Sequence, residues 1–426
     1  MALEPKTYSV LEDIVGPENI SQEPTILDSY AFQMGTKAVP TRIWMARPEA
    51  VVLPGSTEEV QAIIKACNEY GVRFKAFGTG FVTAANVSRP GAIHIDPRRM
   101  NRILEINERD MYAVVEPYVT WVRLQAETFK KGLNCNVIDG GGQCSICASC
   151  TSGWGMGGKS VAMGHNERNV LGVEWVLPTG EILRLGSVGS GSGWFCGDGP
   201  GPSLRGIMRG FLGAWGGLGV FTKVAVKLYH WPGPPDFFPL KGVSPVYEAE
   251  LPKTFRTHYC FFEDWGDFAD AGRKIGETEI AAQFEKVSPA VVASMGTRSN
   301  QEFYHIYHMM RTLIKGPAFQ IVIEAETQKE FEYKEKVLRQ IVTETNGKFF
   351  PLMEHERMQS RVIPGVIKVS TIARGLFRPT GAYSSTMGSM DTWDLGITEA
   401  QVGADIKKKA IEEGPVSYTH LTLPTN

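Results

Sequence analysis

Residues 48–86, PEAVVLPGSTEEVQAIIKACNEYGVRFKAFGTGFVTAAN, begin with a short apolar run and continue into a strongly patterned helix. The apolar run 50–53 predicts a strand that ends at Pro54. Ser56 stands three residues before Glu59, which is the spacing of a capping box at a helix start. Apolar side chains then recur at helical spacing up to the next glycine, so this stretch predicts a strand followed by an amphipathic helix.

A second short strand, 72–76, follows that helix and leads into Gly78-Thr79-Gly80. A Rossmann fingerprint has its glycines between the first strand and the helix, so this chain does not follow that pattern. A glycine turn after the second strand can leave backbone N–H groups free to bind an anion. The alternative is a tight turn that needs glycine for a positive φ, and the glycines alone do not decide between the two.

Three later segments carry a family resemblance in order: IHIDPRRMNRILEINERDMYAVVEPYVTW at 93–121, MGHNERNVLGVEWVLPTGEILRLG at 163–186 and GAWGGLGVFTKVAVKL at 213–228. Together with residues 48–86 they resemble the vanillyl-alcohol oxidase/p-cresol methylhydroxylase (PCMH-type) superfamily of FAD-binding oxidoreductases. Within that superfamily the sequence is most similar to the glycolate oxidase catalytic subunit and to the D-lactate and D-2-hydroxyglutarate dehydrogenases. The similarity thins after Pro235.

Length and composition limit the class of protein. A chain of 426 residues exceeds what one hydrophobic core usually supports, so we expect two domains. The net charge of −2 gives no electrostatic reason to expect nucleic acid or an anionic membrane as a partner. No apolar run has the length of a transmembrane segment, and the N-terminus lacks a signal-peptide pattern. The odd count of seven cysteines predicts reduced thiols and a cytoplasmic location. The family resemblance adds membrane association through a partner as an alternative.

The predicted fold is α+β, with a PCMH-type FAD-binding domain of two subdomains at 48–230 and a ferredoxin-like substrate cap domain at 236–414. Residues 1–47 are expected to form an N-terminal arm with one short helix, 9–15. Residues 415–426 resemble translated sequencing-adapter sequence, and we interpret them as a non-native tail. The C-terminal segment of the flavin domain is then expected to be missing; a natural disordered tail is the alternative.

The cap domain is predicted from two strand–helix–strand units, which favour a ferredoxin-like antiparallel sheet with helices on one face. In the resembled family a cap of this kind covers the flavin ring and supplies the substrate pocket. The strands are expected at 256–262, 281–286, 319–325 and 348–353, and the helices at 264–278, 303–314 and 329–345.

The resemblance implies that FAD is the cofactor and is bound without a covalent link. The dehydrogenase relatives have arginine and threonine where this chain has Phe77 and Phe81, which weakens the transfer of side-chain contacts but not of the backbone cradle. The glycine-rich loop 191–202 is interpreted as structural. The residues implied to bind the cofactor are Pro54, Phe77, Gly78, Thr79, Gly80, Phe81, Val82, Cys147, Ala148, Ser149, Ser152, Gly157, Gly164, His165, Gly219 and Val220.

Cys144, Cys147 and Cys150 form a CxxCxxC motif. Read alone, this spacing is typical of three ligands of an iron–sulfur cluster, with Cys135 or Cys196 as the fourth. Under the resemblance, however, the motif falls where relatives contact the flavin, and a cluster would occupy that space. We therefore favour small buried thiols lining the flavin site; a cluster and a cysteinyl–flavin bond remain alternatives.

Candidate catalytic residues lie in the second half of the chain. Arg374 and Arg378 are candidate clamps for a substrate carboxylate, because guanidinium binds carboxylate in a bidentate manner. Tyr383 and Trp393 are candidates to line the pocket. His355, beside Glu354, follows a predicted strand end where a cap residue can face the flavin.

No metal site is predicted. His305 and His308 share a helix face but lack a carboxylate at matching spacing, so we interpret them as surface or packing residues. The hydroxy-acid dehydrogenases of the superfamily carry a C-terminal histidine/glutamate segment that binds a metal and acts as base. Nothing similar occurs before Gly414, so no general base is assigned.

The predicted function is an FAD-dependent dehydrogenase that oxidises a hydroxy acid or alcohol by hydride transfer to flavin N5. Electrons would then pass to a protein or quinone acceptor, with an iron–sulfur or electron-transfer protein as partner. An alkyl-transfer or reductase branch on the same fold is a further enzymatic alternative. A non-catalytic flavin or iron–sulfur electron-transfer subunit is the alternative from another class, favoured by the cysteine motif and by the missing catalytic segment.

Overall fold

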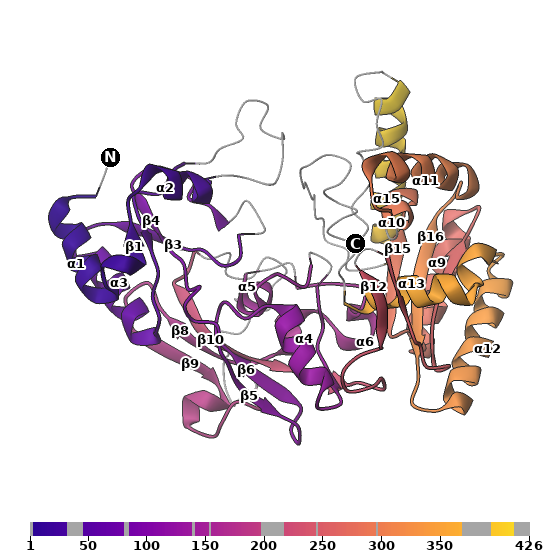
Figure 1. Ribbon diagram of the computed structural model, residues 1–426, viewed down its shortest axis with the longest axis horizontal. Helices are drawn as coiled ribbons and strands as arrows, with labels where there is room; N and C mark the ends of the chain where they lie inside the picture. The colour runs from indigo at the N-terminus through magenta and orange to yellow at the C-terminus, as the bar shows by residue number, and fades with distance from the viewer. Residues whose placement is uncertain are drawn as a thin grey trace. The chain divides into compact units, whose positions relative to one another are not determined.

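The computed structural model describes residues 3–31, 46–80, 85–138, 141–152, 155–196, 217–243, 246–294, 297–368 and 393–412. The chain divides into two compact units (Figure 1). The first unit comprises 1–156 and 165–230, and the second comprises 157–164 and 231–426. The short segment 157–164 therefore packs with the second unit although both of its neighbours in the chain belong to the first.

The first unit begins with a four-stranded sheet of order β1-β2-β4-β3. Strands β2, β4 and β3 are parallel, and β1 joins them antiparallel. Its strands are β1 (Ile20–Ser21), β2 (Val51–Val52), β3 (Arg73–Ala76) and β4 (Ala92–Ile95), and its helices are α1 (Pro5–Val15), α2 (Pro24–Ala31) and α3 (Thr57–Glu69), with a 3₁₀ turn η1 (Pro17–Asn19) after α1. Helix α1 begins four residues before the predicted helix, because Pro5 occupies the first turn, where proline is well tolerated.

The predicted start of α3 is confirmed. The Ser56 hydroxyl accepts a hydrogen bond from the Glu59 N–H at 3.1 Å. The return bond of the capping box goes to Gly55 rather than to Ser56, with the Gly55 N–H donating to Glu59 Oε2 at 2.8 Å. Val60, Ile63 and Ile64 are fully buried, so the helix covers one face of the sheet with the residues that the apolar pattern selected.

The second sheet of this unit has the order β5-β6-β10-β8-β9, and every pair is antiparallel. The apolar/polar alternation along 218–228 predicts a half-buried strand, but β10 is the central strand, and both Val220 on one face and Phe221 on the other are buried. The elements are β5 (Ile103–Asn107), β6 (Tyr112–Val115), α4 (Trp121–Phe129), β7 (Leu133–Asn134), α5 (Ile146–Thr151), α7 (Asn166–Asn169), β8 (Val170–Val176), β9 (Ile182–Gly186), η3 (Ser187–Ser190), β10 (Val220–Lys227) and β11 (Tyr229–His230).

Helix α3 joins the two sheets of the first unit. Its buried face shares a core with Val176 of β8 and Val220 of β10. The Thr57 hydroxyl at the start of α3 donates to the Glu174 carboxylate of β8 at 2.8 Å, and Lys223 of β10 pairs with the same carboxylate at 2.7 Å. The two sheets therefore form one compact body.

The second unit contains an antiparallel sheet of order β15-β16-β14-β17. This strand order is that of a ferredoxin-like fold, as predicted. Strand β17 ends at Phe349, whereas the prediction ran to residue 353, because Pro351 starts a 3₁₀ turn and has no N–H for the sheet. The strands are β14 (Phe255–Phe261), β15 (Gln283–Val287), β16 (Ala318–Glu324) and β17 (Lys348–Phe349).

Helices cover both faces of this sheet, which corrects the prediction of helices on one face. Phe268 of α9 and Leu338 of α12 pack on the first face, and Val292 of α10, Met310 of α11 and Val362 of α13 pack on the second. The helices of this unit are α6 (Ser160–Met163), α9 (Trp265–Thr278), α10 (Pro289–Ser294), α11 (Asn300–Leu313), α12 (Gln328–Glu344), η4 (Pro351–Glu354), α13 (Glu356–Ile367) and α15 (Trp393–Glu412), and β12 (Leu240–Val243) and β13 (Val246–Ala249) form a hairpin.

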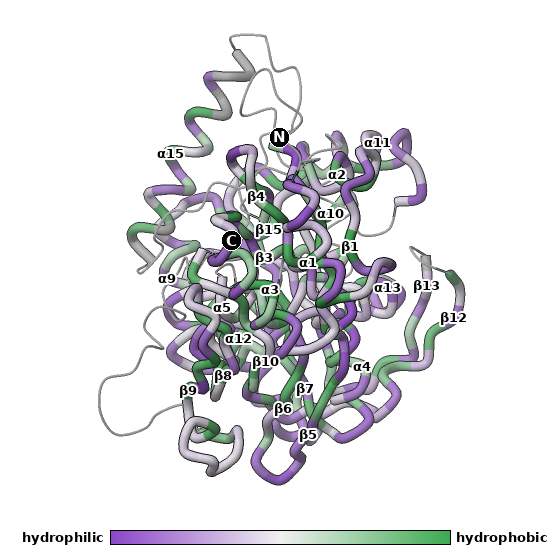
Figure 2. Tube along the Cα trace, turned by 90° about the vertical axis from the view of Figure 1, so that its left-hand side faces the viewer, coloured by the Kyte–Doolittle hydropathy of each residue, from purple (hydrophilic) through white to green (hydrophobic). Residues whose placement is uncertain are grey.

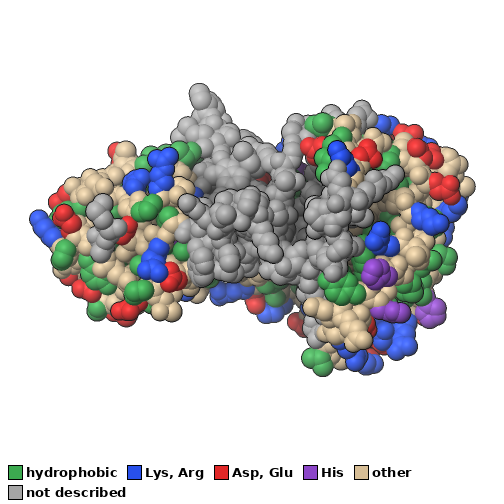
Figure 3. Space-filling view, turned by 90° about the horizontal axis from the view of Figure 1, so that it is seen from above, with side chains coloured by type: hydrophobic (Ala, Val, Ile, Leu, Met, Phe, Trp, Pro, Cys, Tyr) green, Lys and Arg blue, Asp and Glu red, His purple; other side chains and the backbone are tan. Residues whose placement is uncertain are grey.

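Polar and apolar residues are mixed along the described chain (Figure 2), and charges of both signs are mixed on the face that Figure 3 draws. Figure 2 shows hydrophilic and hydrophobic residues alternating along the chain. Figure 3 shows acidic and basic side chains interspersed over the described residues of the face drawn. None of the described helices has the length and apolarity needed to cross a membrane.

Candidate functional site

The glycine turn after β3 leaves several of its backbone N–H groups without a hydrogen-bond acceptor. Within the described residues, the N–H groups of Gly78, Thr79 and Gly80 donate no hydrogen bond. Gly80 has a φ of 68°, in the region that glycine favours. Consecutive unbonded N–H groups in such a turn form a concave site for an oxyanion. The structure thus favours the anion-binding interpretation of the turn that the sequence left open.

Helix α5 lies directly against this turn. The Ser145 N–H donates to the Thr79 hydroxyl at 3.1 Å, and a Cβ placed on Gly78 would lie 3.6 Å from the Ala148 Cβ. Ser145 also caps α5, its hydroxyl accepting from the Ala148 N–H at 3.1 Å. The structure therefore brings together two segments that the sequence predicted to share the cofactor, 77–80 and 147–152.

Side chains of the second sheet's helices hold α5 in place. The Trp121 indole N–H of α4 donates to the Ser149 hydroxyl at 3.2 Å, and that hydroxyl donates to the Ser145 carbonyl at 2.7 Å. Ser149 is buried by these contacts, whereas Ala148 is partly exposed and Ser152 follows the helix end. Small side chains thus form the side of α5 next to the glycine turn.

The donor set of this site suits a diphosphate. It offers backbone N–H groups and hydroxyls, with glycine, alanine and serine leaving room for a ligand to approach the main chain. A metal cation would instead need several oxygen or sulfur ligands. The residues present therefore fit the phosphates of a flavin nucleotide.

Other predicted cofactor residues have structural contacts of their own. The Phe77 ring packs edge-on against Tyr30 at 4.8 Å and His94 at 4.9 Å between centroids. Position 219 has no room for a side chain beside β8, because an added Cβ would lie 2.3 Å from the Val176 carbonyl oxygen. Pro54 and Val220 are buried. Phe81 and Val82 lie outside the described residues, so their contacts with a cofactor stay a prediction.

Gly157 and Gly164 belong to the segment that packs with the second unit. The Gly157 N–H donates to the Ser160 hydroxyl at 3.0 Å, and Gly164 ends α6 with a φ of 71°. The Lys159 ammonium between them donates to the Ile367 carbonyl at the end of α13 at 2.8 Å. His165, back in the first unit, is exposed and precedes α7 without a side-chain cap bond.

The cysteine motif is a group of buried thiols. Cys144, Cys147 and Cys150 are all buried and free. Burial raises the pKa of the Cys147 thiol to about 12, so it is protonated at neutral pH, whereas a cluster ligand or a nucleophile is a thiolate. Among the described residues, no three His, Cys, Asp or Glu side chains are placed to hold a metal ion. The three cysteines are thus buried, free thiols, and their position along the flavin site stays a prediction.

Glu167 is a buried carboxyl that the sequence reading missed. It is 3% exposed; its Oε1 accepts from the Gly155 N–H at 3.1 Å, and its Oε2 has no hydrogen-bond partner. Burial raises its pKa to about 7. The unpaired Glu167 oxygen is thus a buried polar atom that the described part of this unit leaves without a hydrogen bond.

We predict that Glu167→Gln stabilises the protein in a pH-dependent way. The folded-state pKa of Glu167 is above its ordinary value of 4.5, because burial disfavours the charged carboxylate. The carboxyl therefore costs no stability below about pH 4.5, and its cost grows with pH until it is complete above about pH 7. Unfolding free energies should therefore favour the variant by about 3 kcal/mol near pH 8 and by little near pH 5. Thermal unfolding at both pH values tests this, and an equal effect at both would contradict it.

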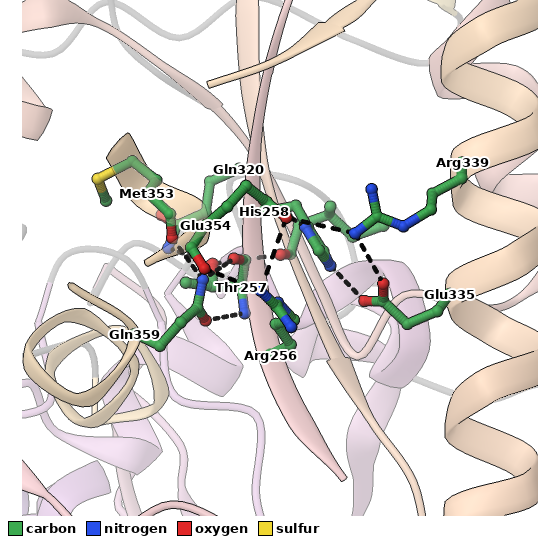
Figure 4. A network of polar contacts seen from close by, with 10 residues as sticks. Arg256, Thr257, His258, Gln320, Glu335, Arg339, Met353, Glu354 and Gln359 are labelled. Atoms are coloured by element: carbon green, nitrogen blue, oxygen red, sulfur yellow. Dashed lines mark hydrogen bonds and ion pairs between the residues drawn. The ribbon is translucent and has the colours of Figure 1, made fainter. Parts of the chain in front are cut away.

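The second unit contains a buried charge network around His258 on β14 (Figure 4). The imidazole is fully buried, with Nδ1 2.7 Å from Glu354 Oε1 and Nε2 bonded to Glu335 of α12. Arg339 contacts Glu335 at 3.2 Å and Glu354 at 3.3 Å. The two carboxylates raise the pKa of His258 against the effect of burial, so the network binds β14, α12 and the turn at 351–354 together.

The predicted catalytic residues are not brought together in the described part of the chain. His355 is exposed and caps α13, its Nδ1 accepting from the Arg357 N–H at 3.4 Å. Arg374, Arg378 and Tyr383 lie outside the described residues, and nothing is described of the Trp393 side chain. His305 and His308 are exposed on α11.

These features define an α+β protein with an unbonded glycine turn beside α5 in a unit of two small sheets, and a ferredoxin-like sheet in the other unit. Residues 48–186 match the model of the FAD binding domain family, so the chain contains an FAD-binding domain and FAD is its cofactor. The p-cresol methylhydroxylase structure with bound substrate aligns with a TM-score of 0.69 at 18% identity, covering 87% of this chain and 71% of that one. This match confirms the predicted PCMH-type fold.

Two sequence relatives are similar over different lengths. An FAD-linked oxidoreductase of Mycobacterium tuberculosis is 32% identical over 219 residues, which is 51% of this chain and 44% of the relative. D-2-hydroxyglutarate dehydrogenase of Stutzerimonas stutzeri is 26% identical over 385 residues, 86% of this chain and 76% of the relative. The chain thus spans less than half the length of the Mycobacterium protein.

Proposed function

We propose that this protein is an FAD-dependent dehydrogenase that oxidises the CH–OH group of a hydroxy acid and passes the electrons to a protein or quinone acceptor. The observation that carries the proposal is the row of unbonded N–H groups at 78–80 against α5. It is supported by similarity along most of the chain to a dehydrogenase named for a hydroxy acid.

We infer which described residues would bind and orient the cofactor. The N–H groups of 78–80 would hold the phosphates, and the small side chains of α5 would let the nucleotide approach the main chain. Bound FAD supplies the acceptor for a hydride at its N5 atom. Arg374 and Arg378 are proposed to bind the substrate carboxylate, with Tyr383 lining the pocket, because planar guanidinium groups pair with carboxylates.

Anaerobic titration with a panel of D-2-hydroxy acids and simple alcohols tests this proposal. The oxidised-flavin absorbance of the FAD-loaded protein is expected to bleach with a hydroxy acid, and to return when a quinone or dye acceptor is added. Arg374→Met should raise the concentration of acid needed for bleaching by at least about tenfold, because one bidentate ion pair is lost. A flavin that no hydroxy acid or alcohol reduces, yet that exchanges electrons with a dye, would support the non-catalytic electron-transfer alternative instead.

A further inference from the structure

Lys75 and His94 form a polar pair on the face of the first sheet that α2 covers. They are register partners on β3 and β4, and His94 also pairs in register with Val51 of β2, so the three side chains share one face. Val51 packs there with Leu27 and Tyr30 of α2. Burying an ammonium ion or an imidazole on an apolar face costs free energy unless a counter-charge or a hydrogen-bond partner compensates it.

The Lys75 ammonium has no partner in the described part of the chain. No hydrogen bond from its Nζ and no ion pair with a carboxylate is formed there, although the side chain is only partly exposed. Burial lowers the pKa of Lys75 below its ordinary value. A partly desolvated cation without a counter-charge is complementary to an anion.

His94 is the uncharged member of this pair, so the positive charge belongs to Lys75. Its imidazole is fully buried beside the Tyr30 and Phe77 rings, and Nε2 has no hydrogen-bond partner. Burial, with a smaller effect of the Lys75 charge, lowers the pKa of His94 to about 4, so the ring is neutral at physiological pH. The Lys75 carbonyl lies 3.4 Å from Nδ1 and is the one hydrogen-bonding neighbour of the ring among the described residues.

The unpaired cation and the unbonded N–H groups belong to one short segment. Lys75 is three residues before Gly78, and a strand rises only about 3.3 Å per residue, so both features lie at the same end of β3. The Lys75 ammonium lacks a counter-charge and the N–H groups lack acceptors in the described part of the chain. Both features favour a negatively charged ligand.

We propose that Lys75 binds the diphosphate of the cofactor, adding a charge-assisted contact to the backbone N–H groups of 78–80. The proposal rests on FAD binding at this turn and assigns one side chain to it. The ligand chemistry is a phosphate oxyanion, and inorganic phosphate in solution is its other source. A lysine suits this role as a point charge that needs no fixed bidentate geometry.

Calorimetric titration of the apoprotein with FAD, ADP, adenosine and inorganic pyrophosphate tests the proposal. Lys75→Met is expected to weaken FAD and ADP about tenfold each, to leave adenosine unchanged and to reduce the dependence of FAD affinity on salt. Lys75→Arg should restore most of the affinity. Lys65→Met is the matched control, since Lys65 is an exposed lysine on α3.

The other outcomes are distinguishable. Unchanged FAD and ADP affinities in Lys75→Met would overturn the proposal, and so would a loss confined to pyrophosphate, which would indicate a separate phosphate site. Equal weakening of adenosine would show a structural effect and would also overturn it; unfolding temperatures of the variants check this independently. A wild-type protein that binds no FAD would defeat the cofactor assignment itself, whatever the variants do.

Discussion

His258→Leu is expected to destabilise the second unit by about 3 kcal/mol. The imidazole lies between Glu335 and Glu354, and leucine would leave both carboxylates without their buried partner. The side chains of Glu335 and Glu354 are only 14% and 21% exposed, so water replaces the lost contacts poorly. Arg339 still contacts both carboxylates, which places the expected loss at the lower end of the range for a broken buried ion pair.

The same network predicts how stability depends on pH. The pKa of His258 is raised in the folded protein, so its contribution is complete below its ordinary value of 6.5 and is lost as pH rises through the folded pKa. The pKa values of Glu335 and Glu354 are lowered, so their contributions are present above 4.5 and are lost as pH falls through the folded values. The wild type should therefore be most stable between these limits. In His258→Leu, stability should no longer fall as pH rises through the folded pKa of His258.

Hydrogen exchange of the β14 amides and calorimetric unfolding measure this effect in the unit concerned. His305→Leu on α11 is the control, because His305 is an exposed histidine of the same unit and should change stability little. His258→Leu combined with Glu335→Leu should recover part of the loss, since no Glu335 carboxylate is then left without its buried imidazole partner. Wild-type stability in His258→Leu would show that the network contributes nothing.

Local signals in the sequence were enough to predict several elements. The Ser56–Glu59 spacing located the start of α3, and two strand–helix–strand units predicted the ferredoxin-like sheet. The burial of β10 was not predictable in the same way, because it depends on β6 and β8, which are distant in sequence and pair with both of its edges. A period of two cannot distinguish a central strand from a half-buried one when the polar positions carry long side chains such as Lys223.

The site was predictable only as far as its backbone. Glycine spacing indicated the turn at 78–80, since bare N–H groups need small residues and no particular partner. The His258 network joins a strand, a helix and a turn that are remote in sequence, and no local spacing relates them. A polar residue within the apolar strand 255–261 was the one available signal for it. Lys75 and His94 are likewise polar residues among the apolar residues of short strands.

The conformation of Gly80 leads to the second large prediction, that Gly80→Val weakens FAD binding by about 10- to 100-fold. Its φ of 68° is strained for any side chain and most strained for a β-branched one. An added Cβ would also lie 2.6 Å from the Phe77 ring, which is held by Tyr30 and His94 and has little room to move. Strain of about 1–3 kcal/mol would reshape the turn and turn its N–H groups away from the phosphates.

Gly78→Ala is the matched control, because it changes the same turn without that strain. Gly78 has no positive φ, and its added Cβ would meet Ala148 and Ser145 at ordinary contact distances of 3.6 and 3.8 Å. The new methyl group then faces α5, so the N–H groups remain available and FAD affinity should change less than about threefold. Flavin content after purification and calorimetric titration compare the two variants. If Gly80→Val kept wild-type affinity while folded, the conformation of this turn would not be what holds the cofactor.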